Sequence, residues 1–222
     1  VMVPDNDGAD ILAGAVFMLK SELRLGQQLT VFNKVSVDSF ISIQADSKAM
    51  KNVVKEAKRM AELDGSIIIF GETGTGKEML AKACHEASRR SEGAFLALNC
   101  ASLPDNVAET ELFGFAPGAF GQTDNKAGLL ELAQGGTLFL DEVGDMSAKL
   151  QINLLLMLQD SSYRRIGNVK ELQVDVRIIC TTQNDLGKLM QEGRFREDLF
   201  YRVAIGVIHL PPLRQRSGDI SY

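Results

Sequence analysis

The residues with the clearest chemical potential form a glycine-rich segment, GETGTGKE, from Gly71 to Glu78. The segment satisfies the pattern G-x-x-x-x-G-K and directly follows an apolar run. Its glycines allow backbone N–H groups to curl around phosphates, and Lys77 supplies a charge for the outer phosphates. An ordinary glycine turn is the alternative, but the preceding apolar run favours a phosphate loop. The residues predicted to bind ATP are Gly71, Glu72, Thr73, Gly74, Thr75, Gly76, Lys77 and Glu78.

A second group with potential chemistry is the acidic pair Asp141-Glu142, which ends the apolar run Thr137–Leu140. The position after the loop lysine usually carries Ser or Thr for magnesium, but here it is Glu78, so the metal must be held by other groups. Asp141 is predicted to hold Mg²⁺ directly or through water. Glu142 is predicted to polarise the water that attacks the γ-phosphate. A surface acidic pair is the alternative, and the phosphate loop in the same chain argues against it.

The elements that must position these groups alternate between strands and helices. Buried strands are predicted at Ser66–Phe70, Ala94–Leu98, Thr137–Leu140, Val176–Cys180 and Val203–Leu210. Helices are predicted at Met50–Leu63, Glu78–Arg89, Val107–Phe113, Ala148–Gln159 and Leu186–Glu192, with Ser47 capping the first. This alternation predicts an α/β fold with a five-stranded parallel sheet between helices.

The bulk composition is that of a globular protein and excludes several function classes. The chain has 222 residues, of which 45% are hydrophobic and 24% charged, and its formal net charge is −5. That charge argues against a chain that coats nucleic acid by itself. No apolar run is long enough to span a membrane and no signal peptide is present, which predicts a cytoplasmic protein without membrane partners. Its three cysteines and two histidines lack the spacing of a metal or disulfide framework.

These residues together resemble the central AAA+ domain of the bacterial enhancer-binding transcription regulators, from Val37 to Asp219. The loop GETGTGKE is that family's own version, with Glu78 included. Five further segments follow the family pattern in order: LNCA at 98–101, ELFG at 111–114, GGTLFLDE at 135–142, FREDL at 195–199 and LPPLR at 210–214.

The resemblance implies roles for residues outside the two motifs above. Asn99 is expected to hydrogen-bond Glu142 and hold it off water until the assembly is ready. Thr182 and Gln183 fall where a nucleotide-sensing pair sits, although the family usually has Asn in place of Gln183. Arg196 and Arg202 match the arginines that reach the ATP of the next subunit. Salt bridges on a helix surface are the alternative role for both arginines.

One loop departs from the family pattern in a way that bears on function. The family loop that grips the alternative sigma factor reads GAFTGA, whereas residues 118–123 read GAFGQT. The threonine is replaced by Gly121, and Thr123 is the rival candidate for its role. This loss resembles the branch of the family that responds to aromatic amino acids and does not drive the alternative polymerase.

The sequence therefore leaves two functions open. The first is the ATP-binding AAA+ domain of a DNA-binding transcription regulator that responds to aromatic amino acids, in which ATP and Mg²⁺ promote effector binding and self-association, from dimer to hexamer. The second is an ATP-hydrolysing motor that activates the alternative-sigma RNA polymerase. This segment alone is expected to hydrolyse ATP weakly or not at all. Any DNA contact is expected in a C-terminal domain outside the chain, and RNA polymerase is an expected partner.

The expected organisation has three parts. Residues 1–36 are interpreted as the end of an upstream PAS-type domain with a linker helix, 37–213 as the ATP-binding core, and 214–222 as the start of a truncated helical lid.

Overall fold

A five-stranded parallel sheet organises the chain in the computed structural model, which describes residues 39–43, 45–119 and 125–219. The spatial order of the strands is β2-β5-β8-β1-β9, and every neighbouring pair is parallel. Their bounds are β1 Ile67–Phe70, β2 Phe95–Asn99, β5 Thr137–Asp141, β8 Arg177–Thr182 and β9 Gly206–His209. Because all five strands run in one direction, their carboxyl ends meet at a single edge of the sheet. The predicted parallel α/β fold is confirmed.

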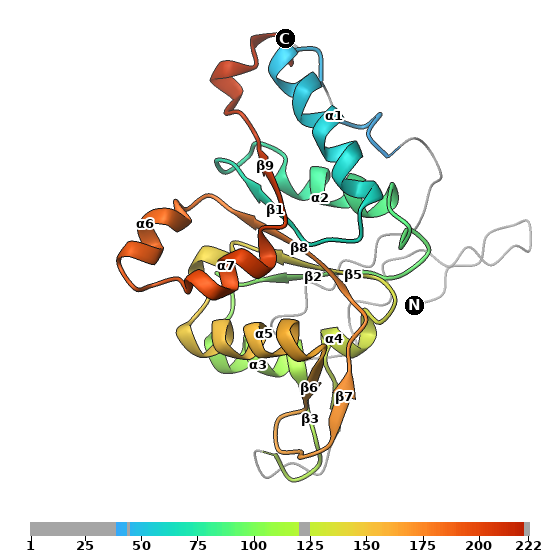
Figure 1. Ribbon diagram of the computed structural model, residues 1–222, viewed down its shortest axis with the longest axis vertical. Helices are drawn as coiled ribbons and strands as arrows, with labels where there is room; N and C mark the ends of the chain where they lie inside the picture. Colours follow the sequence, from blue (N-terminus) through green and yellow to red (C-terminus); the bar gives the residue numbers. More distant parts are fainter. Residues whose placement is uncertain (1–38, 44, 120–124, 220–222) are drawn as a thin grey trace, which may run out of the picture.

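Helices cover both faces of this sheet, which places it between two layers (Figure 1). The helices are α1 Lys48–Glu62, α2 Lys77–Glu86, α3 Asp105–Phe113, α4 Leu129–Leu132, α5 Ala148–Asp160, α6 Leu186–Gln191 and α7 Glu197–Val203. Side chains alternate between the faces: Ile67 and Ile69 pack in the apolar cluster under α1 and α2, whereas Ile68 packs in the cluster on the other face. Burial on both faces explains the continuous apolar strands of the sequence.

Helix α1 has its capping residue where the sequence predicts it. The Ser47 hydroxyl accepts a hydrogen bond from the backbone N–H of Met50 at 3.2 Å. The same hydroxyl donates to Asp219 at 2.8 Å, so it also fixes the C-terminal turns η4 (Leu213–Gln215) and η5 (Ser217–Asp219) beside the helix. Figure 1 shows these turns next to α1.

One predicted strand is wrong at its beginning. The run Val203–Leu210 was expected to be a single strand, but Val203 is the last residue of α7 and β9 begins at Gly206. Val203 is buried at the end of the helix, and a short apolar run does not distinguish a buried helix end from a strand. Strand β8 extends two residues beyond its predicted end, to Thr182.

Two small antiparallel pairs were not predicted and lie at the end of the domain below α3 and α5 in Figure 1. They are β3 (Gly114–Phe115) with β4 (Lys126–Ala127), and β6 (Ser162–Arg164) with β7 (Glu171–Gln173). The loop position Gly121 and the upstream segment expected at 1–36 lie outside the described residues.

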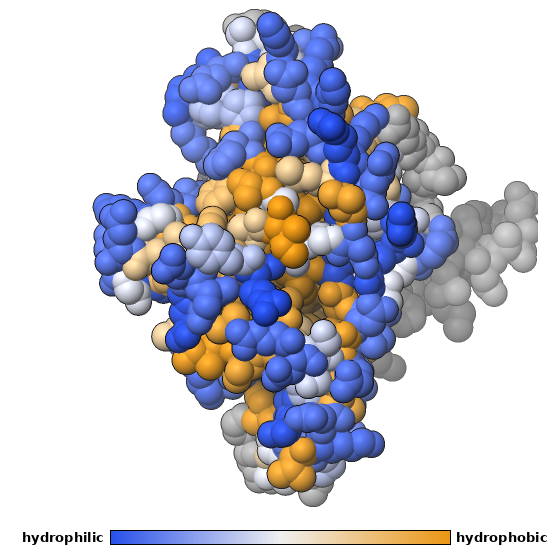
Figure 2. All heavy atoms as spheres, in the orientation of Figure 1, coloured by the Kyte–Doolittle hydropathy of each residue, from blue (hydrophilic) through white to orange (hydrophobic). Residues whose placement is uncertain are grey.

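The surface of the molecule carries both hydrophilic and hydrophobic side chains. Figure 2 shows hydrophilic side chains around the periphery of this face and hydrophobic ones near its middle. None of the helices in the described ranges combines the length and apolarity that crossing a bilayer requires.

All three cysteines are free and buried, and burial raises the pKa of the Cys84 thiol to about 12, so this thiol stays protonated at neutral pH.

Candidate nucleotide-binding site

The predicted phosphate loop lies at the carboxyl edge of the sheet, between β1 and α2. Gly74 and Gly76 have φ values of 80° and 94°, in the left-handed region that glycine adopts without steric cost. Gly76 is the N-cap of α2 and makes no side-chain capping bond. The first-turn N–H groups of this ten-residue helix therefore remain for an anion, which the helix dipole also favours.

Lys77 is buried in this loop and contacts Glu142. Its side chain is 9% exposed, and its Nζ donates to the carbonyl of Gly71 at 2.9 Å. The same Nζ forms an ion pair with Glu142 Oε1 at 3.1 Å. A buried ammonium group at the start of a helix can neutralise phosphate oxygens, so the loop has the charge that its sequence predicts.

Asp141 and Glu142 lie at the end of β5, and their partners differ from the sequence expectation. Asn99 was expected to bond Glu142, yet its Nδ2 donates to Asp141 Oδ2 at 2.8 Å. The reason is register: Asn99 lies directly opposite Asp141 in the β2–β5 pair. Glu142 is instead held by Lys77 and by the backbone N–H of Gln183, which donates to Oε2 at 2.9 Å.

The predicted sensing pair contacts the loop directly. Gln183 Oε1 accepts a hydrogen bond from the Thr73 hydroxyl at 2.7 Å, and the carbonyl of Thr182 accepts from Gly71 N at 3.1 Å. The end of β8 is therefore joined to the phosphate loop and to Glu142 at once. A ligand that moves the loop would therefore change the hydrogen bond between Thr73 and Gln183.

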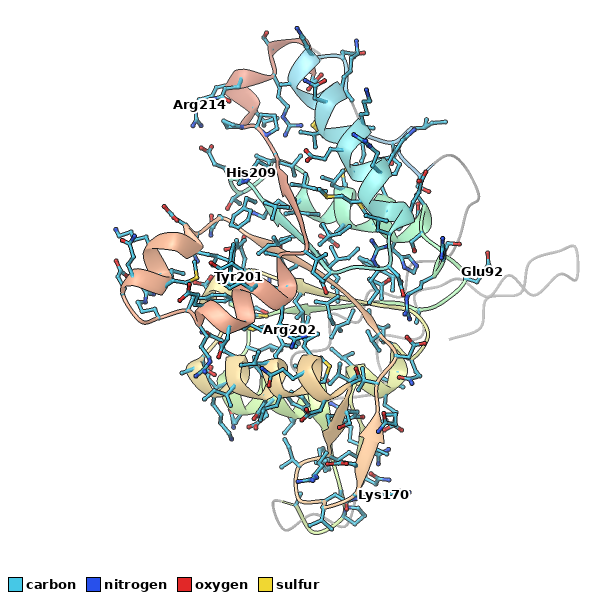
Figure 3. The ribbon with its side chains drawn as sticks, in the orientation of Figure 1. Glu92, Lys170, Tyr201, Arg202, His209 and Arg214 are labelled. Carbon is cyan, nitrogen blue, oxygen red and sulfur yellow. The ribbon has the colours of Figure 1, made fainter. Side chains whose placement is uncertain are left out.

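Two arginines that sequence reasoning did not assign to the site also hold the loop. Arg214 forms two hydrogen bonds of 2.7 Å with the Glu72 carboxylate, and Arg216 donates to the carbonyl of Thr75 at 2.6 Å. Figure 3 shows Arg214 on the turn after β9. Arg216 is buried, whereas Arg214 and Glu72 are exposed, so the Arg216 bond is the stronger restraint. The available signal was the LPPLR segment, which ends at Arg214 and lies two residues before Arg216.

Arg202 lies on α7 (Figure 3), and Arg196 is the N-cap residue of the same helix. Arg196 pairs with Asp198 through two bonds of 3.0 and 2.7 Å, which lowers the pKa of that carboxyl. Arg202 is exposed and has no hydrogen-bond or ion-pair partner among the described residues. A salt bridge on the helix surface, the alternative role for both arginines, is therefore present for Arg196 only.

The arrangement fits a nucleoside triphosphate with its magnesium ion. Within the described ranges, no three His, Cys, Asp or Glu side chains gather as a metal cage. Magnesium in nucleotide sites is commonly held by one or two carboxylates together with the phosphates, and Asp141 is the carboxylate available for this. When bound, the ion would supply charge neutralisation of the phosphates.

The phosphate loop between β1 and α2, the two acidic residues at the end of β5 and the strand order of the sheet together define a P-loop nucleotide-binding domain of the AAA+ class. The comparison with protein families agrees: the model of the Sigma-54 interaction domain matches residues 43–209. The chain belongs to this family.

Among curated relatives, the chain is 50% identical to the HTH-type transcriptional regulatory protein TyrR of Enterobacter agglomerans, over 97% of this chain and 42% of the relative. It is 48% identical to TyrR of Salmonella typhimurium, over 95% of this chain and 40% of the relative. Among solved structures, NtrX from Brucella abortus in complex with ATP is 38% identical with a TM-score of 0.74, covering 80% of this chain and 40% of NtrX. The chain thus spans about two fifths of the length of the relatives it matches.

Proposed function

We propose that this chain is the ATP-binding domain of a DNA-binding transcription regulator that responds to aromatic amino acids. ATP with Mg²⁺ would promote effector binding and self-association of the whole protein. The similarity to TyrR supports the class of regulator. The single observation that carries nucleotide binding is Lys77, which is buried in the loop and forms an ion pair with Glu142.

In this proposal each part of the site has a separate task. The N–H groups of the loop and of the α2 N-terminus bind the phosphates, and Lys77 neutralises the outer ones. Asp141 orients the metal, and Gln183 reports the position of the loop through Thr73. Glu142 accepts a proton from water where hydrolysis occurs, and Asn99 positions the neighbouring Asp141.

Arg202 is proposed to act on the ATP of a neighbouring subunit, with Arg196 in support. The guanidinium of Arg202 is exposed, which suits a contact made only on assembly. Arg196 must first release Asp198. This in-trans role would make hydrolysis depend on protein concentration and leaves an isolated domain with weak or no turnover.

Calorimetric titration of ATP with Mg²⁺ tests the proposal. The chain should bind ATP, and Lys77→Ala should weaken binding about 30-fold or more, because a charge-assisted contact to phosphate is lost. Lys82→Ala is the matched control, since Lys82 lies on the same helix and pairs with Glu86. Equal ATP affinity of Lys77→Ala and the parent chain would remove the site assignment.

The second candidate function is a motor that activates the alternative-sigma polymerase. The match to the Sigma-54 interaction domain favours it, as does the presence of Glu142 and Arg202. The sequence of the loop at 118–123 opposes it, because Gly121 lacks the hydroxyl and methyl groups of threonine.

In vitro transcription with alternative-sigma holoenzyme separates the two functions. We expect no open complexes with the full-length parent protein. The comparison protein carries Gly121→Thr, Gln122→Gly and Thr123→Ala. Open complexes formed by the parent would establish the motor, and gain of activity in the triple variant alone would show that the loop is the missing part.

A further inference from the structure

Thr181 is a buried residue of the site to which neither the sequence motifs nor the proposed function assigns a role. It is the penultimate residue of β8, with no exposed surface, and β8 lies between β5 and β1 in the sheet. Its hydroxyl donates a hydrogen bond to Asp141 Oδ1. The same oxygen accepts a hydrogen bond from the backbone N–H of Glu142 at 3.3 Å. One hydroxyl therefore contacts both acidic residues.

The contact completes a clamp on the Asp141 carboxylate. Asn99 on β2 donates to Oδ2 at 2.8 Å, and Thr181 on β8 donates to Oδ1, so each carboxylate oxygen is held from a different neighbouring strand. A carboxylate oxygen accepts more than one hydrogen bond or ligand, so each oxygen keeps acceptor capacity after this bond. Rotation of the carboxylate about its terminal bond would break both contacts.

The second contact bears on Glu142. This residue has φ of 54°, a left-handed backbone that is uncommon outside glycine. The Thr181 hydroxyl receives its N–H, while Lys77 and Gln183 hold its carboxylate. The backbone of Glu142 and the carboxylate of Asp141 are thus fixed relative to each other by one atom.

We propose that Thr181 is a positioning residue that presets Asp141 for the magnesium ion of the bound nucleotide. The inference rests on the proposed binding of ATP with Mg²⁺. Partners that orient a metal-ligating carboxylate contribute strongly to metal affinity although they do not touch the metal. Without the hydroxyl, Asp141 is held from the β2 side alone, and ordering the carboxylate costs part of the metal affinity.

Thr181→Val tests this directly because valine keeps the branched shape and removes the hydroxyl. Calorimetric titrations of ATP are made in EDTA and over a series of free Mg²⁺ concentrations. We expect the Mg²⁺ concentration that gives half of the gain in ATP affinity to rise about tenfold in Thr181→Val. Affinity in EDTA should equal that of the parent, and Thr181→Ser should restore the parent Mg²⁺ dependence.

Thr137→Val is the matched control, because Thr137 is an equally buried strand threonine with its own partner, His85 Nδ1 at 2.9 Å. It should lower thermal stability and leave the Mg²⁺ dependence unchanged. If Thr181→Val does not fold, Thr181→Ala takes its place under the same criterion. A parent-like Mg²⁺ dependence in the variant lacking the hydroxyl, or an equal shift in Thr137→Val, overturns the inference. Failure of the parent chain to bind ATP at all would instead overturn the proposed function.

Discussion

The ion pair between Lys77 and Glu142 predicts that Glu142→Gln binds ATP more tightly than the parent chain. In the structure Nζ lies 3.1 Å from Oε1, and both side chains are largely buried, at 9% and 12% exposure. An incoming phosphate must replace this carboxylate as the partner of Lys77. The ion pair therefore competes with the nucleotide, and removing the negative charge weakens the competitor.

The magnitude follows from the geometry. Two unit charges at this separation attract by about 5 kcal/mol at an effective dielectric constant of about 20. Desolvation of the pair offsets most of this attraction, which leaves about 1.5 to 3 kcal/mol for a charged hydrogen bond. A glutamine amide retains about 0.5 to 1.5 kcal/mol of it. The difference, about 1 kcal/mol, corresponds to roughly fivefold tighter ATP binding.

Calorimetric titration of ATP measures the change, with Asp145→Asn as the control. Asp145 is exposed and its carboxylate accepts from Asn184, so the control removes one negative charge three residues away without releasing Lys77. It should change ATP affinity less than Glu142→Gln does. Unchanged or weaker binding by Glu142→Gln would refute the competition, and an equal gain in both variants would assign the effect to net charge.

Three further predictions concern assembly, stability and pH. Arg202→Ala should lower ATP turnover of the assembled protein about 1000-fold, measured by phosphate release, and leave ATP affinity unchanged in titration. Arg196→Ala should lower turnover less. Full turnover in Arg202→Ala would exclude the in-trans role. Ser47→Ala should lower the free energy of unfolding by about 1 to 2 kcal/mol in urea denaturation, because the α1 cap is lost, and an unchanged midpoint would contradict this. Hydrogen bonds from Arg90 outweigh desolvation and lower the pKa of Asp64 below 3.8. The ionised carboxylate of Asp64 therefore contributes fully to the free energy of unfolding above pH 3.8, and this contribution is lost as pH falls through the lowered pKa. The melting temperature of Asp64→Asn should accordingly lie below that of the parent at pH 7 and meet it in acid, and a gap that widens in acid would contradict the sign.

The sequence by itself determined the class of fold and the chemical core of the site. Apolar strands alternating with helical patterns predicted the parallel sheet, because burial on both faces leaves continuous apolar runs. GETGTGKE and Asp141-Glu142 were readable because the first follows β1 directly and the second spans the end of β5, so local chain geometry places both at the carboxyl edge. Such features depend on neighbours in the chain, which a sequence records.

Only the tertiary structure decided which side chains meet across strands. Asn99 bonds Asp141 and not Glu142 because the β2–β5 register sets Asn99 opposite Asp141. The residues of one strand alone do not specify its register with a neighbouring strand. Thr181 entered the site because β8 extends further than its apolar run indicated and lies beside β5. Arg216 reaches Thr75 across 141 residues of chain, a contact that depends on how the segment after β9 returns over the phosphate loop. Contacts between distant segments arise from packing of the whole domain, so their partners become known only when the fold is.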